Sequence, residues 1–180
     1  MDKFTFFYPA DGYSYKNHEI IIRALALLSM KNPLLINNIR VIFTLDSLPF
    51  ELRNLIHENN LTQIVHLIGK IAYTDVLSYY KSADALLFPS KMESFGLPLI
   101  EATCFGLPVI AADLPYAREV LGNYSNKVFV DSDSVDKWVD AIRNYQVYKK
   151  VYHNDIDIRE NSWKSFFELA NRLVQERSHD

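Results

Sequence analysis

Short apolar runs that alternate with amphipathic stretches constrain this chain more than any other feature of its sequence. Runs rich in β-branched, leucine and aromatic residues are typical of buried strands, and they cover residues 4–8, 40–45, 64–68, 83–88, 109–112 and 128–130. Helical spacing of apolar residues follows most of them, at 20–28, 50–59, 74–82, 134–148 and 159–177. Strands with helices between them imply parallel pairing and right-handed crossovers. We therefore expect an α/β fold, a doubly wound, Rossmann-like parallel sheet of about six strands with helices on both faces.

Length and composition bound the class of protein. A chain of 180 residues predicts one domain with a single core. Its 49% apolar and 13% aromatic content excludes a disordered chain. With 19 basic and 22 acidic side chains, the net charge of −3 offers no electrostatic basis for binding nucleic acid.

The single cysteine and the chain start bear on the compartment. Cys104 has no second cysteine to pair with and lies in an apolar helical run, which is typical of a reducing compartment. We expect no signal peptide ahead of the first predicted strand, and the apolar runs fall short of the roughly 20 residues that span a bilayer. We expect a soluble, cytoplasmic domain.

The segment 89–113 carries the clearest functional pattern. It begins where the run 83–88 ends, with a Pro-Ser pair, then Glu93, a Phe95-Gly96 step and an apolar helical stretch that contains Glu101. A strand, a glycine-containing turn and a helix N-terminus are typical of phosphate binding by backbone N–H groups. Carboxylates repel phosphate, so the two glutamates that flank the turn favour hydroxyl groups on either side of it. Hydroxyls, phosphate and hydroxyls in sequence describe a nucleotide sugar.

The run 93–102, Glu-Ser-Phe-Gly-Leu-Pro-Leu-Ile-Glu-Ala, resembles the E-x7-E signature of retaining glycosyltransferases with the GT-B fold. This large family includes sucrose synthase-like, glycogen synthase-like and bacterial polysaccharide-assembling enzymes. Further matching segments are Pro-Ser at 89–90, the stretches 106–110 and 118–122, Lys16-Asn17-His18 and Ser162-Trp163. The resemblance covers nearly the whole chain, but only the C-terminal, donor-binding half of a family protein, which is normally about twice as long.

The resemblance implies different roles for the two glutamates. Glu93 is the predicted catalytic carboxylate, which accepts hydrogen bonds from donor-sugar hydroxyls and favours positive charge at the anomeric carbon. Glu101 is predicted to hold the ribose hydroxyls. The structural alternatives are a solvated loop glutamate at 93 and, at 101, an early-helix glutamate that complements the helix dipole.

The turn between the glutamates is predicted to bind the diphosphate. The predicted donor-binding residues here are Ser94, Phe95, Gly96 and Leu97, and the last three would direct backbone N–H groups at the phosphates. Gly96 permits unusual backbone angles and close approach, and Pro98 suits a first helical turn.

Lys16 is the second predicted catalytic residue. The resemblance implies that it reaches the donor diphosphate from the loop after the first strand and neutralises charge on the leaving nucleotide. The alternative is an ordinary surface lysine. The family usually also has a Gly-Arg pair near the first strand, but here residues 8–11 read Tyr-Pro-Ala-Asp. Lys70 and Lys91 are the candidates for a replacement cation.

The segment after the third strand completes the predicted site. Gly69, Lys70 and Ile71 follow the third strand, where the family cradles the base with backbone groups, although a glycine there also fits a plain turn.

Asp-Ser-Asp at 131–133 has a pattern that binds divalent metals in another glycosyltransferase fold, but its place before a helix near Ser134 favours N-capping. The five histidines show no metal-ligand spacing. We therefore predict no metal and no cofactor other than the nucleotide-sugar substrate.

Together these features predict the donor-binding half of a retaining, hexosyltransferase-type enzyme. It would transfer a sugar from a nucleotide sugar to an acceptor glycan or glycolipid, in bacterial surface polysaccharide biosynthesis. The helix at 159–177 would pack on a missing N-terminal, acceptor-binding domain, and any membrane association would be peripheral and through the full-length protein. The alternatives are a non-catalytic nucleotide-sugar-binding module and one chain of a split glycosyltransferase.

Overall fold

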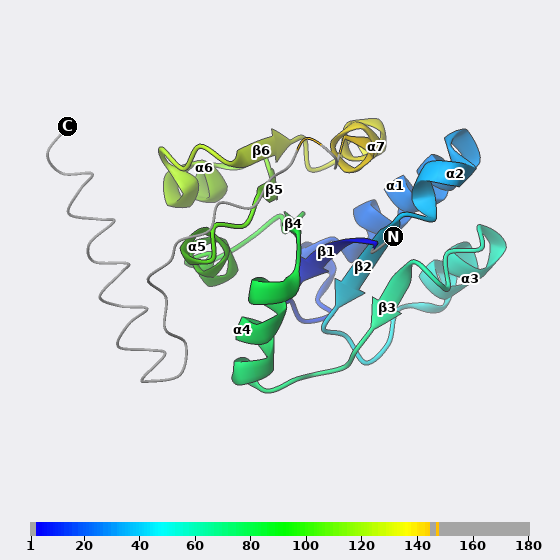
Figure 1. Ribbon diagram of the computed structural model, residues 1–180, viewed down its shortest axis with the longest axis horizontal. Helices are drawn as coiled ribbons and strands as arrows, with labels where there is room; N and C mark the ends of the chain where they lie inside the picture. The colour runs from blue at the N-terminus through cyan, green and yellow to red at the C-terminus, as the bar shows by residue number, and fades with distance from the viewer. Residues whose placement is uncertain (1–2, 145–146, 148–180) are drawn as a thin grey trace, which may run out of the picture.

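The computed structural model describes residues 3–144 and residue 147 (Figure 1). Within these residues, six parallel strands form one sheet with the order β3-β2-β1-β4-β5-β6. The strands are β1 (Phe4–Tyr8), β2 (Ile39–Phe43), β3 (Val65–Leu67), β4 (Ala85–Phe88), β5 (Val109–Ala112) and β6 (Lys127–Val130). The predicted fold class is confirmed.

The helices lie on both faces of this sheet. They are η1 (Ser14–Lys16), α1 (His18–Lys31), α2 (Pro33–Ile36), α3 (Phe50–Glu58), α4 (Tyr73–Ser82), α5 (Leu97–Cys104), α6 (Pro115–Leu121) and α7 (Val135–Arg143). Helix α1 packs with α2, α3 and α7, whereas α5 packs with α6. From β1 to β3 the chain adds strands on one side of β1, and from β4 to β6 it adds strands on the opposite side of β4. Right-handed crossovers therefore place the helices that connect β1, β2 and β3 on one face, and α5 and α6 on the other. Figure 1 shows α4 and α5 on one side of the central strands and α1 on the other.

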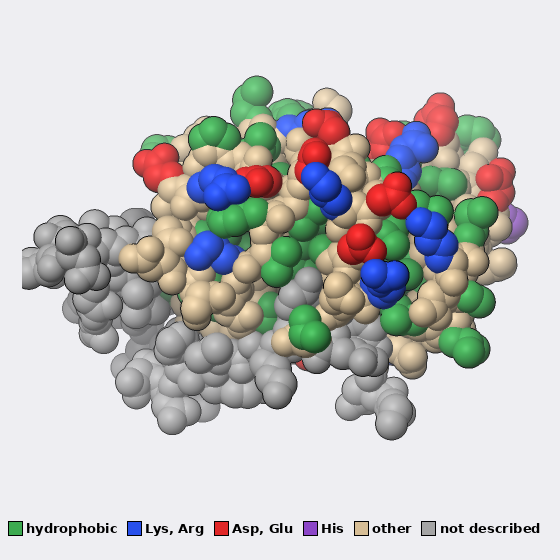
Figure 2. All heavy atoms as spheres, turned by 90° about the horizontal axis from the view of Figure 1, so that it is seen from above, with side chains coloured by type: hydrophobic (Ala, Val, Ile, Leu, Met, Phe, Trp, Pro, Cys, Tyr) green, Lys and Arg blue, Asp and Glu red, His purple; other side chains and the backbone are tan. Residues whose placement is uncertain are grey.

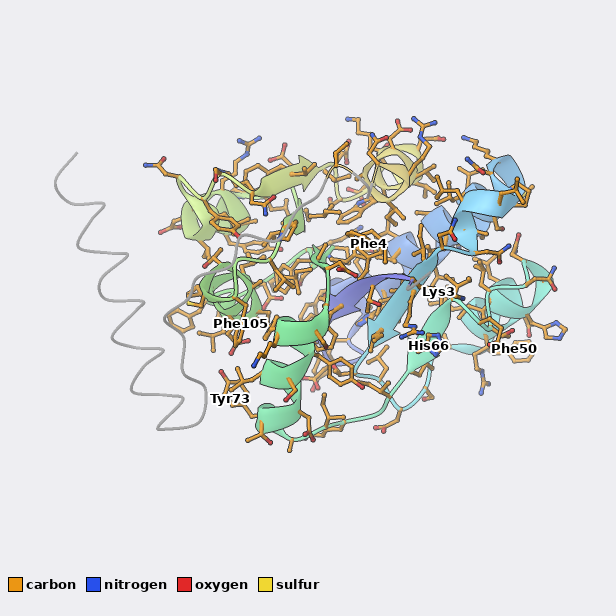
Figure 3. All side chains as sticks on the ribbon, in the orientation of Figure 1. Lys3, Phe4, Phe50, His66, Tyr73 and Phe105 are labelled. Carbon is orange, nitrogen blue, oxygen red and sulfur yellow. The ribbon has the colours of Figure 1, made fainter. Side chains whose placement is uncertain are left out.

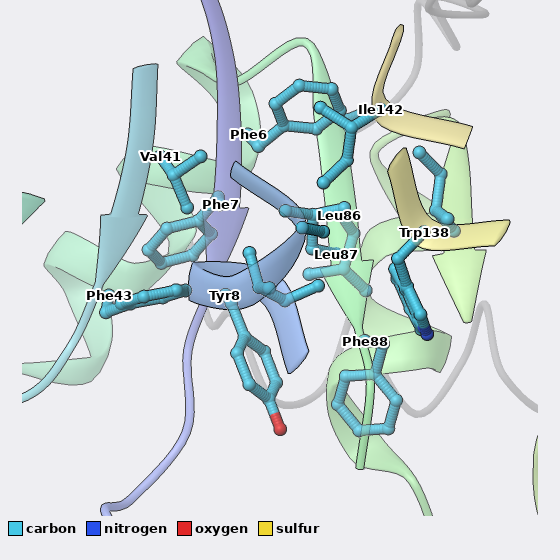
Figure 4. Packing of buried hydrophobic residues seen from close by; sticks show 14 of the residues in the cluster. Phe6, Phe7, Tyr8, Val41, Phe43, Leu86, Leu87, Phe88, Trp138 and Ile142 are labelled. Atoms are coloured by element: carbon cyan, nitrogen blue, oxygen red, sulfur yellow. The ribbon is translucent and has the colours of Figure 1, made fainter. Parts of the chain in front are cut away.

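The central strand β1 is buried on both faces. Phe6, Phe7 and Tyr8 are each fully buried, and successive side chains of a strand point to opposite faces. The Phe7 ring stacks on Tyr79 of α4, whereas the Tyr8 ring contacts His18 of α1. Figure 4 shows the rings of Phe6, Phe7 and Tyr8 among side chains of the neighbouring strands, such as Val41, Phe43 and Leu86. The strand predicted at 4–8 therefore lies in the core of the sheet.

Some elements differ from the predicted boundaries. The short helices α2 and α6 span four and seven residues, too few for apolar periodicity to reveal them. Helix α7 ends at Arg143 and is shorter than the predicted 134–148, of which 145, 146 and 148 lie outside the described residues, as does the predicted helix at 159–177. Its start agrees with the prediction, because the Ser134 side chain caps it by accepting a hydrogen bond from the backbone N–H of Lys137.

Surface charge and helix length bear on possible partners. Figure 2 shows acidic and basic side chains interspersed on the face that it presents. None of the helices in the described residues is long and apolar enough to cross a membrane.

The strand order locates the ligand crevice. Strands β1 and β4 are neighbours. The strands that follow β1 in the chain, β2 and β3, lie on one side of this pair, whereas those that follow β4, β5 and β6, lie on the other. In open α/β sheets, ligands bind outside the carboxyl ends of the strands at this reversal of strand order. The loops 9–17 and 89–96 leave the sheet there, and they contain Lys16 and Glu93.

Candidate functional site

The loops that follow β1 and β4 are bound to each other by several hydrogen bonds. The backbone N–H of Lys91 donates to the carbonyl of Tyr15 at 2.7 Å. The Asn17 amide donates to the carbonyls of Pro89, at 3.3 Å, and Ser132, at 3.0 Å. Asn17 has a positive φ of 56°, a conformation that asparagine tolerates better than most residues. The carboxyl end of the β1–β4 pair is therefore a connected unit.

Lys16 and Glu93, the two predicted catalytic residues, form an ion pair in this unit. The Lys16 ammonium lies 2.6 Å from a Glu93 carboxylate oxygen, and the side chains are 15% and 11% exposed. Limited contact with water strengthens such a pair relative to one at the surface. The structure therefore brings together a cation suited to phosphate and a carboxylate suited to sugar hydroxyls.

Two tyrosines near Glu93, the buried Tyr8 and the half-buried Tyr116, were not identified from the sequence as site residues. The Tyr8 hydroxyl donates to the carbonyl of Lys16 at 2.8 Å, and the Tyr116 hydroxyl donates to the carbonyl of Ser90. Burial, and next the negative charge of Glu93, raise the pKa of both phenols. Both hydroxyls therefore stay protonated and act as donors that fix the two loops. The sequence predicts Tyr8 only as part of the buried strand at 4–8.

The turn at residues 94–97 joins β4 to α5. Gly96 has φ 61° and is the N-cap residue of α5, and a Cβ atom there would lie 3.3 Å from a Leu99 methyl. Phe95 is 76% exposed and Leu97 43% exposed, and Ser94 is exposed. Because the first N–H groups of a helix have no partner within it, the first turn of α5 is suited to an anion.

Glu101 is buried, with 6% of its surface exposed. The hydroxyl of Tyr73 donates to one carboxylate oxygen at 2.9 Å, and the hydroxyl of Tyr80 donates to the other at 2.8 Å. Burial raises the pKa of Glu101, while the two hydrogen bonds act in the opposite direction. Neither tyrosine was identified from the sequence, although their spacing of seven residues places them on one face of α4.

The loop after β3 contains Lys70 and Ile71. Gly69 has φ 74°, and its backbone N–H donates to the carbonyl of Leu45 at 3.0 Å. The N–H of Lys70 lies 3.4 Å from an Asp46 carboxylate oxygen. This turn is thus joined to the loop after β2, and it leads through Ile71 into α4, the helix that contacts Glu101.

Lys91 and the carboxylates of the acidic segment 131–133 are exposed and belong to surface ion pairs. The Lys91 ammonium pairs with Asp133, and Lys137 pairs with Asp131. Hydrogen bonds, from the backbone of Asp133 to Asp131 and from Lys91 to Asp133, lower the pKa of both carboxyls. In the described part of the chain, histidine, cysteine and carboxylate side chains form no group of three or more suited to a metal ion.

Comparison with known proteins identifies relatives of this chain. The sequence model of a family described as "Glycosyl transferases group 1" matches residues 1–154. The O-antigen chain mannosyltransferase RfbU of Salmonella typhimurium is 33% identical over 95 residues, which cover 53% of this chain and 26% of the relative. A D-inositol 3-phosphate glycosyltransferase of Paenarthrobacter aurescens is 23% identical over 161 residues, 89% of this chain and 38% of the relative. The chain thus spans well under half the length of these relatives.

Solved structures share the fold. The Anabaena protein Alr3699/HepE, in complex with UDP and glucose, superposes with a TM-score of 0.67 at 23% identity, over 81% of this chain and 39% of that protein. WaaG, a glycosyltransferase involved in lipopolysaccharide biosynthesis, superposes with a TM-score of 0.67 at 21% identity, over 80% of this chain and 38% of WaaG. Both are GT-B glycosyltransferases, so the sheet described above is of the kind found in that architecture.

Proposed function

This chain belongs to the group 1 glycosyl transferases, and we propose that it carries the nucleotide-sugar donor site of a retaining enzyme. One observation carries the proposal. The Lys16 ammonium and the Glu93 carboxylate meet 2.6 Å apart at the carboxyl end of the β1–β4 pair. A cation there attracts a diphosphate, and a carboxylate beside it accepts hydrogen bonds from sugar hydroxyls.

Each predicted residue then has a role in the transfer. The diphosphate lies on the backbone N–H groups of 95–97 and on Lys16, which stabilise the negative charge that grows as the glycosidic bond breaks. Glu93 accepts hydrogen bonds from the donor sugar and favours positive charge at its anomeric carbon. Glu101 binds the ribose, and the turn at 69–71 contacts the base.

The wider role rests on the relatives. RfbU is an O-antigen chain mannosyltransferase, and WaaG is involved in lipopolysaccharide biosynthesis. Both relatives support a hexosyl transfer to a glycan or glycolipid acceptor in bacterial surface polysaccharide synthesis, on the cytoplasmic side. The chain spans only 26% of RfbU and 38% of the D-inositol 3-phosphate glycosyltransferase. We therefore propose that a further domain supplies the acceptor site. The chain alone would then bind donor and turn over little, without a metal.

Calorimetry on the 180-residue chain tests the donor site. We expect a nucleoside diphosphate among UDP, GDP, ADP and TDP to bind, with and without EDTA, and Lys16→Met to weaken binding about tenfold or more. Lys31→Met is the matched control, because Lys31 makes a surface ion pair with Asp136 at 2.9 Å, away from the crevice. If all four nucleotides fail to bind at millimolar concentration, or both variants behave alike, the proposed site is wrong.

A further inference from the structure

Glu101 is a buried carboxylate whose hydrogen-bond donors are neutral. An ionised carboxylate away from water is costly unless it is hydrogen-bonded or paired with a cation. The ion pairs found among the described residues do not include Glu101. Instead, each of its oxygens accepts a hydrogen bond from a tyrosine hydroxyl, that of Tyr73 or that of Tyr80.

The two tyrosines differ in how the fold holds them. Tyr80 is fully buried, and its ring stacks on Phe105 with centroids 5.7 Å apart and meets the edge of Phe7 at 5.4 Å. Tyr73 is the first residue of α4, separated from the turn at 69–71 only by Ala72, and is partly exposed. Figure 3 shows Tyr73 at one end of α4 and Phe105 beside α5. Tyr80 thus contacts the carboxylate from the core, and Tyr73 contacts it from the first turn of α4.

The arrangement leaves acceptor capacity on Glu101. A carboxylate has about four lone-pair sites, and the two tyrosines use one on each oxygen. Among the described residues no other hydrogen bond reaches these two oxygens, which leaves one site on each for two neighbouring hydroxyl groups such as the 2′ and 3′ hydroxyls of a ribose. This use requires the carboxylate to be ionised, because a protonated oxygen donates rather than accepts.

The groups around Glu101 favour the ionised form against the effect of burial. Burial is the larger effect and holds the pKa of Glu101 above its ordinary value, and the hydrogen bonds from Tyr80 and Tyr73 offset part of this rise. Burial, and then the charge of Glu101, raise the pKa of both phenols, which keeps them protonated donors. Among the described residues the remaining titratable neighbour is Cys104 of α5, where the same two causes raise the thiol pKa to about 11.

We propose that Tyr73 and Tyr80 are positioning residues that hold Glu101 in one orientation, ready to accept hydrogen bonds from both hydroxyls of a ribose. The inference rests on the proposed function and deepens it, since it makes the site selective for ribonucleotides. A 2′-deoxynucleotide would leave one acceptor site of a buried carboxylate unsatisfied, which is unfavourable.

The first experiment measures the carboxyl group in the ligand-free chain. Carbon-13 NMR of the glutamate carboxyls, with Glu101→Gln for assignment, gives the protonation midpoint of Glu101. We expect Tyr73→Phe and Tyr80→Phe each to move this midpoint to higher pH. Tyr79→Phe is the matched control, because Tyr79 lies on the same helix and its ring stacks on Phe7. Equal midpoints in the wild type and all three variants would overturn the proposal, whether or not a nucleotide binds.

The second experiment measures binding affinity as a function of pH. The two ligands are the nucleoside diphosphate that binds best and its 2′-deoxy analogue. In the Tyr73 and Tyr80 variants, we expect the loss of affinity on acidification to begin at higher pH, with a slope of about tenfold per pH unit. The preference for the ribose form should shrink in both. Tyr79→Phe should follow the wild type. Because the phosphates of the ligand titrate alike with every protein, the difference from the wild type excludes their contribution. A uniform loss at every pH, with the ribose preference intact, would show a merely structural role and overturn the proposal.

Discussion

The Lys16 ammonium lies 2.6 Å from the Glu93 carboxylate although 77 positions separate the two residues in the chain. Without a ligand, each group neutralises the other in a setting with little water. A diphosphate that binds Lys16 must therefore compete with Glu93, and sugar hydroxyls that bind Glu93 must compete with Lys16. The same contact that marks the site also opposes the binding of either half of the ligand alone.

We expect Glu93→Gln to strengthen the binding of free nucleoside diphosphate. The amide keeps the shape of the side chain but removes the charge that competes for Lys16, so a gain of about tenfold, roughly 1.4 kcal/mol, is the scale for one charged contact. Calorimetry with the nucleotide alone measures it. Asp136→Asn is the control, since it removes the surface partner of Lys31 and should change nothing. Weaker nucleotide binding in Glu93→Gln would mean that Glu93 itself contacts the nucleotide.

Glu101→Ala should weaken the binding of nucleotide and nucleotide sugar alike. Loss of a charged hydrogen-bond partner of the ribose typically costs about 1.5–3 kcal/mol, on the order of tenfold to a hundredfold in affinity. Parallel titrations with both ligands measure the two losses. A loss confined to the nucleotide sugar would place Glu101 beside the sugar instead of the ribose.

His18 should make the stability of the fold fall in acid. Burial, and next the charge of Lys16, lower its pKa from 6.5 to about 4. Its Nε2 atom has no hydrogen-bond partner among the described residues, and its ring packs on Tyr8 and Phe43. As the pH falls, the unfolded chain binds this proton first, so the contribution of about 3 kcal/mol is complete above pH 6.5 and is lost progressively down to about pH 4.

Urea unfolding of the wild type and of His18→Phe across this range measures the contribution. Other titrating groups, including Glu101, act in both proteins, so the difference between the two isolates His18. We expect the wild type to lose stability relative to the variant on acidification. His57→Gln serves as control, because His57 is exposed. Parallel pH profiles for His18→Phe and the wild type would contradict the prediction.

Gly96→Ala should destabilise the domain by roughly 1–2 kcal/mol. Its φ of 61° is unfavourable for a residue with a Cβ atom, and that atom would lie 3.3 Å from a Leu99 methyl. Chemical denaturation measures the loss. Gly12→Ala is the matched control in the loop after β1, where the nearest atom lies 3.5 Å from an added Cβ. If both variants are equally stable, the left-handed conformation of the turn is not needed.

Much of the fold follows from local pattern. The runs at 4–8 and 109–112 became β1 and β5 with the predicted bounds. Apolar runs of four or five residues rich in β-branched and aromatic side chains favour buried strands, and the amphipathic stretches between them favour parallel pairing with helices on both faces. The glycine turn and the helix with Glu101 were predicted for the same reason, because glycine, proline and helical spacing act within a few residues.

The partners of each site residue depended on tertiary structure. Lys16 was predicted as a phosphate ligand, but its ion pair with Glu93 exists because β1 and β4 are neighbours, a choice made by the order of strands across the whole sheet. The tyrosines that hold Glu101 come from a different helix. Their contact requires α4 to pack beside α5. Sequence by itself determined which segments form strands and helices, since that depends on neighbouring residues. Only packing between distant segments decided which side chains meet, because contact energy depends on distance in space and not on separation along the chain.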